Sequence, residues 1–166
     1  MIVDAQVTID GPKEAVWAAI TDIENAPATI RGIEDVEVLE KPAGGLVGLR
    51  WRETRLLFGK PASVEKWITD AAENAFYKTR AEDSGFVFLS TMTLSESSSG
   101  GITLTSSHET RPQGIVARLK ALPMFLFKGV VKKAILQDLG DIKSAVEGRQ
   151  VADHHGERRE PPTHGL

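Results

Sequence analysis

Few side chains of this sequence could serve as an acid, a base or a polar partner for a small molecule. The candidates are His108, Tyr77 and Glu53, whose imidazole, phenol and carboxylate can exchange protons or hydrogen-bond a carbonyl. Glu109 follows His108 directly, but neighbouring residues on a strand point to opposite faces, so these two cannot form a dyad. Glu53 or Tyr77 could orient the imidazole across a cavity. We favour the alternative that His108 is a polar lining or hydrogen-bonded residue.

One expected strand carries three arginines around a tryptophan: Arg50, Trp51, Arg52 and Arg55. A guanidinium that stacks on an indole or faces a carboxylate would suit an acidic ligand. The alternative, which we favour, is an exposed charged face in which the arginines pair with Glu37 or Glu65.

Other reactive groups are scarce. The chain has no Cys, which excludes disulfides, thiolate nucleophiles, iron–sulfur clusters and cysteine zinc sites. Three of the four His residues, His154, His155 and His164, lie near the C-terminus. No spacing of His, Asp and Glu before them resembles a metal site, and no glycine-rich phosphate loop is present. We therefore expect no metal and no cofactor.

Composition indicates one ordinary globular domain. The 166 residues are 41% hydrophobic and 26% charged, with a formal net charge of −3. No run of basic residues offers a nucleic-acid surface. The longest apolar run, 121–127, is too short to cross a bilayer, and no secretory signal precedes the first expected strand. These features predict a cytoplasmic protein.

Hydrophobic periodicity predicts the elements that position the candidate residues. A strand over 2–9 is followed by a helix from Pro12 that ends before Pro27, and by a short helix or turn over 27–31. Six further strands are expected over 33–40, 46–55, 62–69, 75–81, 86–94 and 102–110. Their short turns require antiparallel pairing, so the sheet is a meander.

The chain is expected to become helical from Gly114 to Glu147, with an interruption at Pro123. An apolar stripe spaced by four, three and four marks one face: Ile135, Leu139, Ile142 and Val146. The other faces carry polar residues: Lys132, Lys133, Asp138, Asp141 and Lys143. We predict an α+β domain over 1–148, in which one sheet wraps the long helix, and a disordered polar tail over 149–166.

The inward strand faces mix polar and apolar residues. Buried hydroxyl, imidazole and carboxylate groups cost free energy, so their presence favours a ligand-binding cavity over a core built for stability alone. The expected lining residues are Trp51, Glu53, Tyr77, Phe88, Ser90, Met92, Leu104, Ser106, His108, Phe127, Val131 and Ile135.

Five stretches resemble one family. They are I-D-G-P-K-E-A-V-W-A-A-I-T-D-I-E-N-A-P (9–27), V-E-V-L-E (36–40), G-L-R-W-R-E-T-R (48–55), G-G-I-T-L-T (100–105) and L-Q-D-L-G-D-I-K-S-A-V-E (136–147). Their order and separation are similar to those of the helix-grip superfamily. That superfamily groups START lipid-transfer domains, polyketide cyclases/dehydrases, coenzyme-Q-binding proteins and birch-pollen-type allergens. The resemblance covers residues 1 to about 148.

The resemblance implies a curved seven-stranded antiparallel sheet around a long C-terminal helix, with two short helices after the first strand and a deep cavity for a hydrophobic molecule. It carries over no catalytic residue, because the superfamily has no universal catalytic set. Members that do chemistry stabilise enolates with a few polar groups. Here the candidates would be Arg50, Arg52, Glu53, Tyr77 and His108.

Three functions remain open. The first is binding of a lipid, polyketide or quinone-like molecule without catalysis, which the scarcity of catalytic groups favours. The second is a cyclase or dehydratase acting on an enolisable carbonyl. The third is a quinone carrier that contacts membranes through Lys132 and Lys133 beside the apolar stretch 122–131, although core packing around a helix kink explains that stretch more plainly. The sequence does not define the ligand or the oligomeric state.

Overall fold

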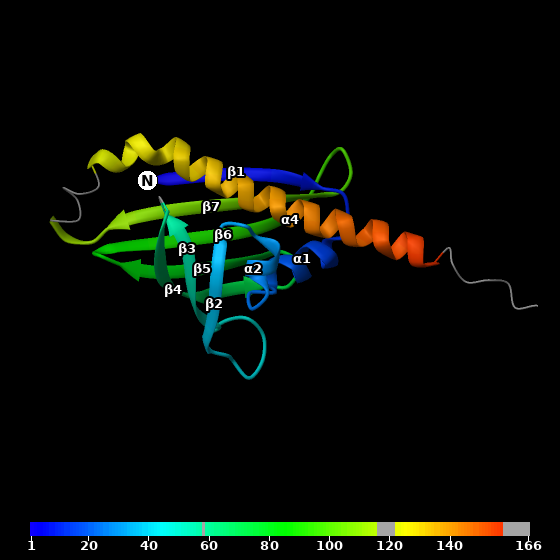
Figure 1. Cartoon of the computed structure of the whole chain (residues 1–166), viewed down its shortest axis with the longest axis horizontal. Coiled ribbons are helices and arrows are strands. Elements are labelled where there is room, and N and C mark those ends of the chain that lie inside the picture. Colours follow the sequence, from blue (N-terminus) through cyan, green and yellow to red (C-terminus); the bar gives the residue numbers. More distant parts are fainter. Residues whose placement is uncertain (58, 116–121, 158–166) are drawn as a thin grey trace, which may run out of the picture.

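A seven-stranded antiparallel sheet and one long helix make up most of the molecule (Figure 1). The structure, a computed structural model, describes residues 1–57, 59–115 and 122–157. The strands are β1 (Ile2–Ile9), β2 (Ile33–Glu40), β3 (Arg50–Leu57), β4 (Lys60–Ala72), β5 (Phe76–Asp83), β6 (Phe86–Glu96) and β7 (Ile102–Pro112). The helices are α1 (Lys13–Thr21), α2 (Ala26–Thr29), the 3-10 helix η1 (Leu122–Phe127) and α4 (Lys128–Glu157). The fold that the resemblance implies is confirmed.

The strand order is β1-β7-β6-β5-β4-β3-β2, so every neighbour is consecutive in sequence except β1 and β7. The antiparallel register brings the start of β1, the end of β7 and the two turns β3–β4 and β5–β6 to one end of the sheet. We call this the β3–β4 end.

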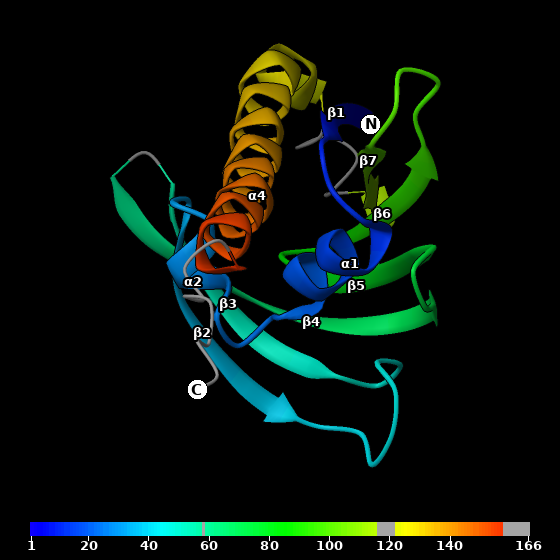
Figure 2. The ribbon, with the colours of Figure 1, turned by 90° about the vertical axis from the view of Figure 1, so that its right-hand side faces the viewer.

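Helix α4 runs along β1 and begins at the β3–β4 end. In the second half of α4, Lys143 Nζ donates to Thr8 O at 2.6 Å, and Glu147 Oε1 accepts from the backbone N–H of Asp10 at 2.9 Å. The sheet curves around this helix, with α1 and α2 lying between α4 and the strands β3–β5 (Figure 2). The concave face of the sheet and the helices therefore enclose the interior.

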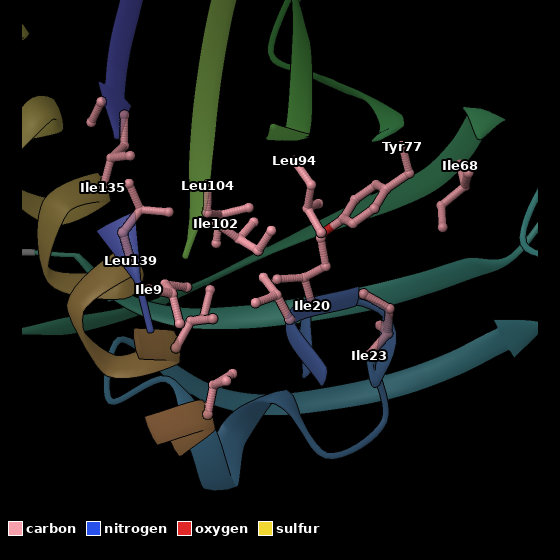
Figure 3. Packing of buried hydrophobic residues seen from close by; sticks show 14 of the residues in the cluster. Ile9, Ile20, Ile23, Ile68, Tyr77, Leu94, Ile102, Leu104, Ile135 and Leu139 are labelled. Atoms are coloured by element: carbon pink, nitrogen blue, oxygen red, sulfur yellow. The ribbon is translucent and has the colours of Figure 1, made fainter. Parts of the chain in front are cut away.

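The predicted apolar stripe of α4 is buried in the core. Ile135, Leu139, Ile142 and Val146 are at most 6% exposed. Leu139 packs with Ile9 and Leu104 of β1 and β7 (Figure 3). Burying each such side chain is worth about 1.5–3 kcal/mol, so this stripe fixes where α4 lies on the sheet.

Several element boundaries differ from the prediction. β3 begins at Arg50 rather than at 46, because Gly48 adopts a φ of +93° and the N–H of Leu49 turns back to Leu46 O at 3.0 Å. Pro12 is the N-cap of α1 rather than its first helical residue. α4 continues past Glu147 to residue 157 through Arg149, Gln150 and Ala152, which are good helix formers.

The expected helix from Gly114 falls partly on residues 116–121, which lie outside the described residues. In the part described, Pro123 lies in η1 rather than in an α-helix. Within the described chain, no helix has both the length and the apolar character needed to cross a bilayer.

Candidate functional site

A cavity of about 110 Å³ lies between the concave face of the sheet and the helices. Its helical side is mostly apolar: Ile20 of α1 and Ile23, just after that helix, flank it, and Ile135, Leu139 and Ile142 line it from α4 beside the charged Asp138. Its sheet side is polar, with carboxylate, guanidinium, ammonium, hydroxyl and imidazole groups. A molecule in this space would contact hydrocarbon on one side and hydrogen-bonding groups on the other.

A second hollow of about 290 Å³ adjoins this cavity. The two share five lining residues: Glu53, Arg55, Lys66, Ser90 and His108. The second hollow continues along the concave face to Ala62, Asp83 and Phe88, which lie toward the β3–β4 end. We call this hollow the mouth of the cavity.

Glu53 is the centre of the polar wall. It lies on β3, two residues before Arg55 on the same face, and diagonally opposite Lys66 of β4. Its side chain is 6% exposed, and its Oε1 accepts from Arg55 Nε at 2.6 Å and from Lys66 Nζ at 2.8 Å. Its Oε2 accepts from the indole Nε1 of Trp51 at 3.4 Å. The carboxylate is therefore held by two cations and an indole N–H.

Arg55 connects this group to α4, because its NH1 lies 2.8 Å from Asp138 Oδ2. Two carboxylates and two cations thus alternate across the cavity wall. We call these four residues, Glu53, Arg55, Lys66 and Asp138, the buried ion cluster.

The buried ion cluster shifts the pKa values of its acids in opposite directions. Burial alone would raise the pKa of Glu53, but the charges and hydrogen bonds of Lys66 and Arg55 outweigh it and lower the pKa to about 2. For Asp138, burial dominates and raises the pKa, and Arg55 offsets only part of this effect. Glu53 is the firmly ionised carboxylate, and Asp138 is the one that protonates more easily.

His108 is bonded by hydroxyls on both ring nitrogens. Ser90, its cross-strand partner, lies 3.0 Å from Nδ1, and Ser106, two residues earlier on β7, lies 2.8 Å from Nε2. Burial, together with the positive charges of Lys66 and Arg55, lowers the pKa of His108 to about 4. The imidazole is neutral at pH 7, so it can donate from one nitrogen and accept at the other.

The phenol of Tyr77 completes the wall. Its ring packs edge-on against Trp17 at a centroid distance of 6.3 Å, and the residue is 8% exposed. Burial raises its pKa, and the negative charge of Glu53 adds to this effect, so the hydroxyl stays protonated. Within the described chain, no side chain or backbone group hydrogen-bonds this hydroxyl, which leaves it available to a ligand in the cavity.

Most of the predicted lining residues lie along the cavity: Trp51, Glu53, Tyr77, Ser90, Met92, Ser106, His108 and Ile135. Phe88 lines the mouth instead. Leu104 is fully buried in the core, and Val131 packs against the core without reaching the cavity. Phe127, in η1, is 48% exposed and lies outside the lining. Ser90 and Ser106, rather than Glu53 or Tyr77, hold the two ring nitrogens of His108.

The arginines of β3 separate to the two faces of the sheet. Arg50 and Arg52 both bond Glu65 at 3.0 Å, and Arg52 also bonds Glu37 at 2.6 Å, all on the convex face. The favoured prediction, an exposed paired face, is confirmed for these two arginines. Arg55 alone points into the cavity.

Sequence reasoning missed Lys66 and Asp138. We predicted that Asp138 would lie on a solvent-facing side of its helix, but it lines the cavity beside the apolar stripe. Its position one residue before Leu139 was the available signal. The described residues contain no group of three or more His, Asp or Glu placed to hold a metal ion.

Comparisons with known proteins support the architecture. A family model described as polyketide cyclase/dehydrase and lipid transport matches residues 1–147. None of the curated proteins matches this sequence.

Solved structures share the fold at low identity. TTHA0849 from Thermus thermophilus has a TM-score of 0.74 at 16% identity, covering 90% of this chain and 99% of its own. The ZhuI aromatase/cyclase from Streptomyces sp. R1128 has a TM-score of 0.69 at 20% identity, covering 90% and 94%. A START superfamily protein from Mycobacterium smegmatis has a TM-score of 0.64 at 19% identity, covering 89% and 95%.

Proposed function

The chain belongs to the polyketide cyclase/dehydrase and lipid transport family, and we propose that it binds a small apolar molecule carrying an uncharged oxygen group. The apolar body would contact the helices, and the oxygen group would face Tyr77, Ser106 and His108. Ketones, quinones and alcohols have this chemistry.

The charge balance of the cavity wall supports an uncharged group. Arg55 and Lys66 already form ion pairs with Glu53, and Arg55 also forms one with Asp138. A ligand carboxylate would have to displace Glu53 or enter beside two existing carboxylates. The serines, the neutral imidazole and the phenol offer both donors and acceptors without that cost.

One observation supports the proposal above all: the sheet side of the cavity is mostly polar, and the helical side opposite it is mostly apolar. Burying four charges costs several kcal/mol per ion before their attraction is counted, and a sheet packed on a helix for stability alone would use aliphatic side chains there. Such a mixture is typical of small-molecule sites.

The volumes set the ligand size. An apolar cavity of about 150 Å³ accommodates a benzene ring in an unrelated protein. The inner cavity of about 110 Å³ thus suits part of one ring, and a larger ligand would extend into the mouth of about 290 Å³. We expect a ligand of one to a few rings, or a short chain, inserted with its oxygen group innermost.

The test is a ligand panel built on one skeleton: a naphthoquinone, a naphthol, naphthalene and a naphthoic acid, scored by thermal shift and native mass spectrometry. The quinone and the naphthol should bind more tightly than the hydrocarbon or the acid, and Tyr77→Phe with Ser106→Ala should weaken them about tenfold, the equivalent of one or two hydrogen bonds. Arg52→Gln on the convex face is the matched control and should change nothing. If all four compounds leave the protein unaffected, or the acid binds best, the proposal is wrong.

A second candidate function, catalysis at an enolisable carbonyl, is favoured by the neutral imidazole of His108 and the protonated phenol of Tyr77 along one wall of the cavity. Hydrogen bonds donated by these two groups would stabilise an enolate oxygen. In that case His108→Ala and Tyr77→Phe should abolish turnover of a polyketide-like diketone while leaving its affinity within about tenfold. If these variants lose affinity and turnover to the same extent, the two residues serve to bind the molecule, and the result supports the first proposal, ligand binding without catalysis.

A further inference from the structure

Positive charge is concentrated in one stretch of this acidic protein. Residues 111–137 contain six basic residues and no Asp or Glu: Arg111, Arg118, Lys120, Lys128, Lys132 and Lys133. Because the whole chain has a formal net charge of −3, the remainder without these six positive charges carries −9. Such asymmetry is typical of a chain that contacts an anionic surface with one part only.

Large apolar side chains are exposed in the same stretch. Ile115 is 78% exposed, Leu126 83% and Val130 55%. Lys128, Lys132 and Lys133 are exposed in the same stretch. We call these six residues the docking surface.

The docking surface lies at the β3–β4 end of the sheet, where the mouth of the cavity also lies. η1 and the first turns of α4 are at the same end of the molecule as the tip of β7 (Figure 1). Ile115 is three residues past the end of β7, and the backbone N–H of Gln113, two residues before it, donates to Gly85 O in the β5–β6 turn at 2.7 Å. Asp83 and Phe88, on either side of that turn, line the mouth.

We propose that the docking surface binds an anionic lipid bilayer and places the mouth of the cavity against it. Leucine, isoleucine and valine side chains enter the acyl boundary, while lysines remain at the headgroups and attract anionic lipid. Each basic residue near such a surface contributes about fivefold to partitioning. The proposal goes beyond ligand binding and does not depend on it.

Charge and side-chain chemistry argue against two other partners for the docking surface, a second copy of the chain and a nucleic acid. A second copy of the chain would bring the same lysines face to face, and like charges oppose such an interface. A nucleic acid would pair with the lysines but would leave the aliphatic Ile115, Leu126 and Val130 in water, because bases stack on aromatic rings and, of the exposed large apolar side chains described in this stretch, only Phe127 is aromatic.

The experiment is co-sedimentation of the full chain with two kinds of vesicle, pure phosphatidylcholine and phosphatidylcholine mixed with phosphatidylglycerol. The wild type should sediment with the mixed vesicles, much less with the neutral ones, and less at high salt. Lys132→Glu with Lys133→Glu should lower the partition coefficient at least about tenfold. Leu126→Ser with Val130→Ser should lower it severalfold while retaining the salt dependence.

Matched controls separate the docking surface from net charge and from folding. Lys13→Glu with Arg149→Glu makes the same change in net charge at the opposite end of the molecule, where Gly11 approaches Gln150, and should leave partitioning within about twofold. Circular dichroism should show each variant folded, and the milder Lys132→Gln with Lys133→Gln covers the case in which charge reversal unfolds the chain. Tyr77→Phe with Ser106→Ala should sediment as the wild type does, so failure of ligand binding and failure of docking are distinguishable.

Three results would overturn the proposal: no wild-type sedimentation with mixed vesicles, equal loss in the Lys13/Arg149 control, or concentration-dependent dimerisation that Leu126→Ser with Val130→Ser abolishes without any vesicle binding. The last result would assign the surface to a second copy of the chain.

Discussion

Strand β3 carries two groups of charges that differ in burial far more than in composition. On its convex face, Arg50 and Arg52 bond Glu65 of β4 at 3.0 Å, and these side chains are 39–43% exposed. On its concave face, Glu53 bonds Arg55 and Lys66, and its side chain is 6% exposed. Both groups are built from carboxylates and cations on neighbouring strands.

Solvent exposure, rather than residue type, therefore decides how much such ion pairs contribute to stability. Exposed pairs are screened and contribute little. Buried pairs are expensive to form and more expensive to break, so their partners are held in place. The lowered pKa values of Glu53 and Glu65 have the same direction, yet only the first belongs to a wall that a ligand could reach.

The largest expected effect is that of Glu53→Gln. Removing this carboxylate leaves Lys66 and Arg55 with unneutralised charge, and breaking a buried pair in this way costs about 3–5 kcal/mol. Urea unfolding should show the loss as a lower midpoint with an unchanged m-value. Adding Lys66→Met should restore part of the stability, because the unpaired ammonium is then absent. Full stability of the single variant would mean that the buried ion cluster is solvated like the convex pairs.

The next effect is a pH dependence from His108. Its pKa is lowered to about 4 in the folded state from an unfolded value of about 6.5, so the unfolded chain binds the extra proton between these pH values. Stability is therefore complete above about pH 6.5 and falls as the pH drops toward 4, by about 3 kcal/mol in total. Glu53, with a pKa near 2, changes stability only below about pH 4.3.

His108→Gln should keep a polar side chain between the serines while removing the titration. The wild type should lose about 1 kcal/mol between about pH 7.5 and about pH 5.5, and the variant should lose much less, as measured by urea unfolding at both values. Equal losses would show that the imidazole is as accessible to water as the convex charges are.

Sequence alternation predicted which residues of a strand face the interior. It did not predict how far the cavity extends along that inner face. Alternation with period two is local, so Trp51, Glu53, Ser106 and His108 were placed on the inner face without knowledge of the fold. Leu104 shares that face but lies in the core, because depth depends on where α4 crosses the sheet. No short-range pattern encodes that crossing.

The residues that sequence reasoning missed come from long-range pairing. Lys66 reaches Glu53 through the register of β3 and β4, and β4 is interrupted by an irregularity between Ile68 and Asp70. Asp138 meets Arg55 only once α4 has packed across the concave face. Both contacts depend on tertiary geometry, which the turn residues and periodicity do not specify.

A smaller effect is expected for Asp138→Asn, which lies between the two extremes of burial. After the substitution, Arg55 still forms its ion pair with Glu53. Burial already raises the pKa of Asp138, so the loss of its attraction to Arg55 is partly offset because a buried charge is no longer present. We expect a loss of about 1 kcal/mol in urea unfolding. A loss as large as that of Glu53→Gln would show that the link from β3 to α4, rather than burial, determines the strength of the cluster.

The smallest effect is expected for Glu65→Gln on the convex face, the matched control for Glu53→Gln. Glu65 accepts from both Arg50 and Arg52, but all three side chains are about two-fifths exposed and water replaces the lost bonds. Arg50 also stays in place through its contact with Trp67, whose ring centre lies 5.5 Å from the guanidinium carbon. The urea midpoint should therefore be nearly that of the wild type, and high salt should remove the remaining difference. If the loss instead approached that of Glu53→Gln and persisted in high salt, exposure would not distinguish the two charge groups of β3, and the case for a ligand-facing wall would rest on the serines, His108 and Tyr77 alone.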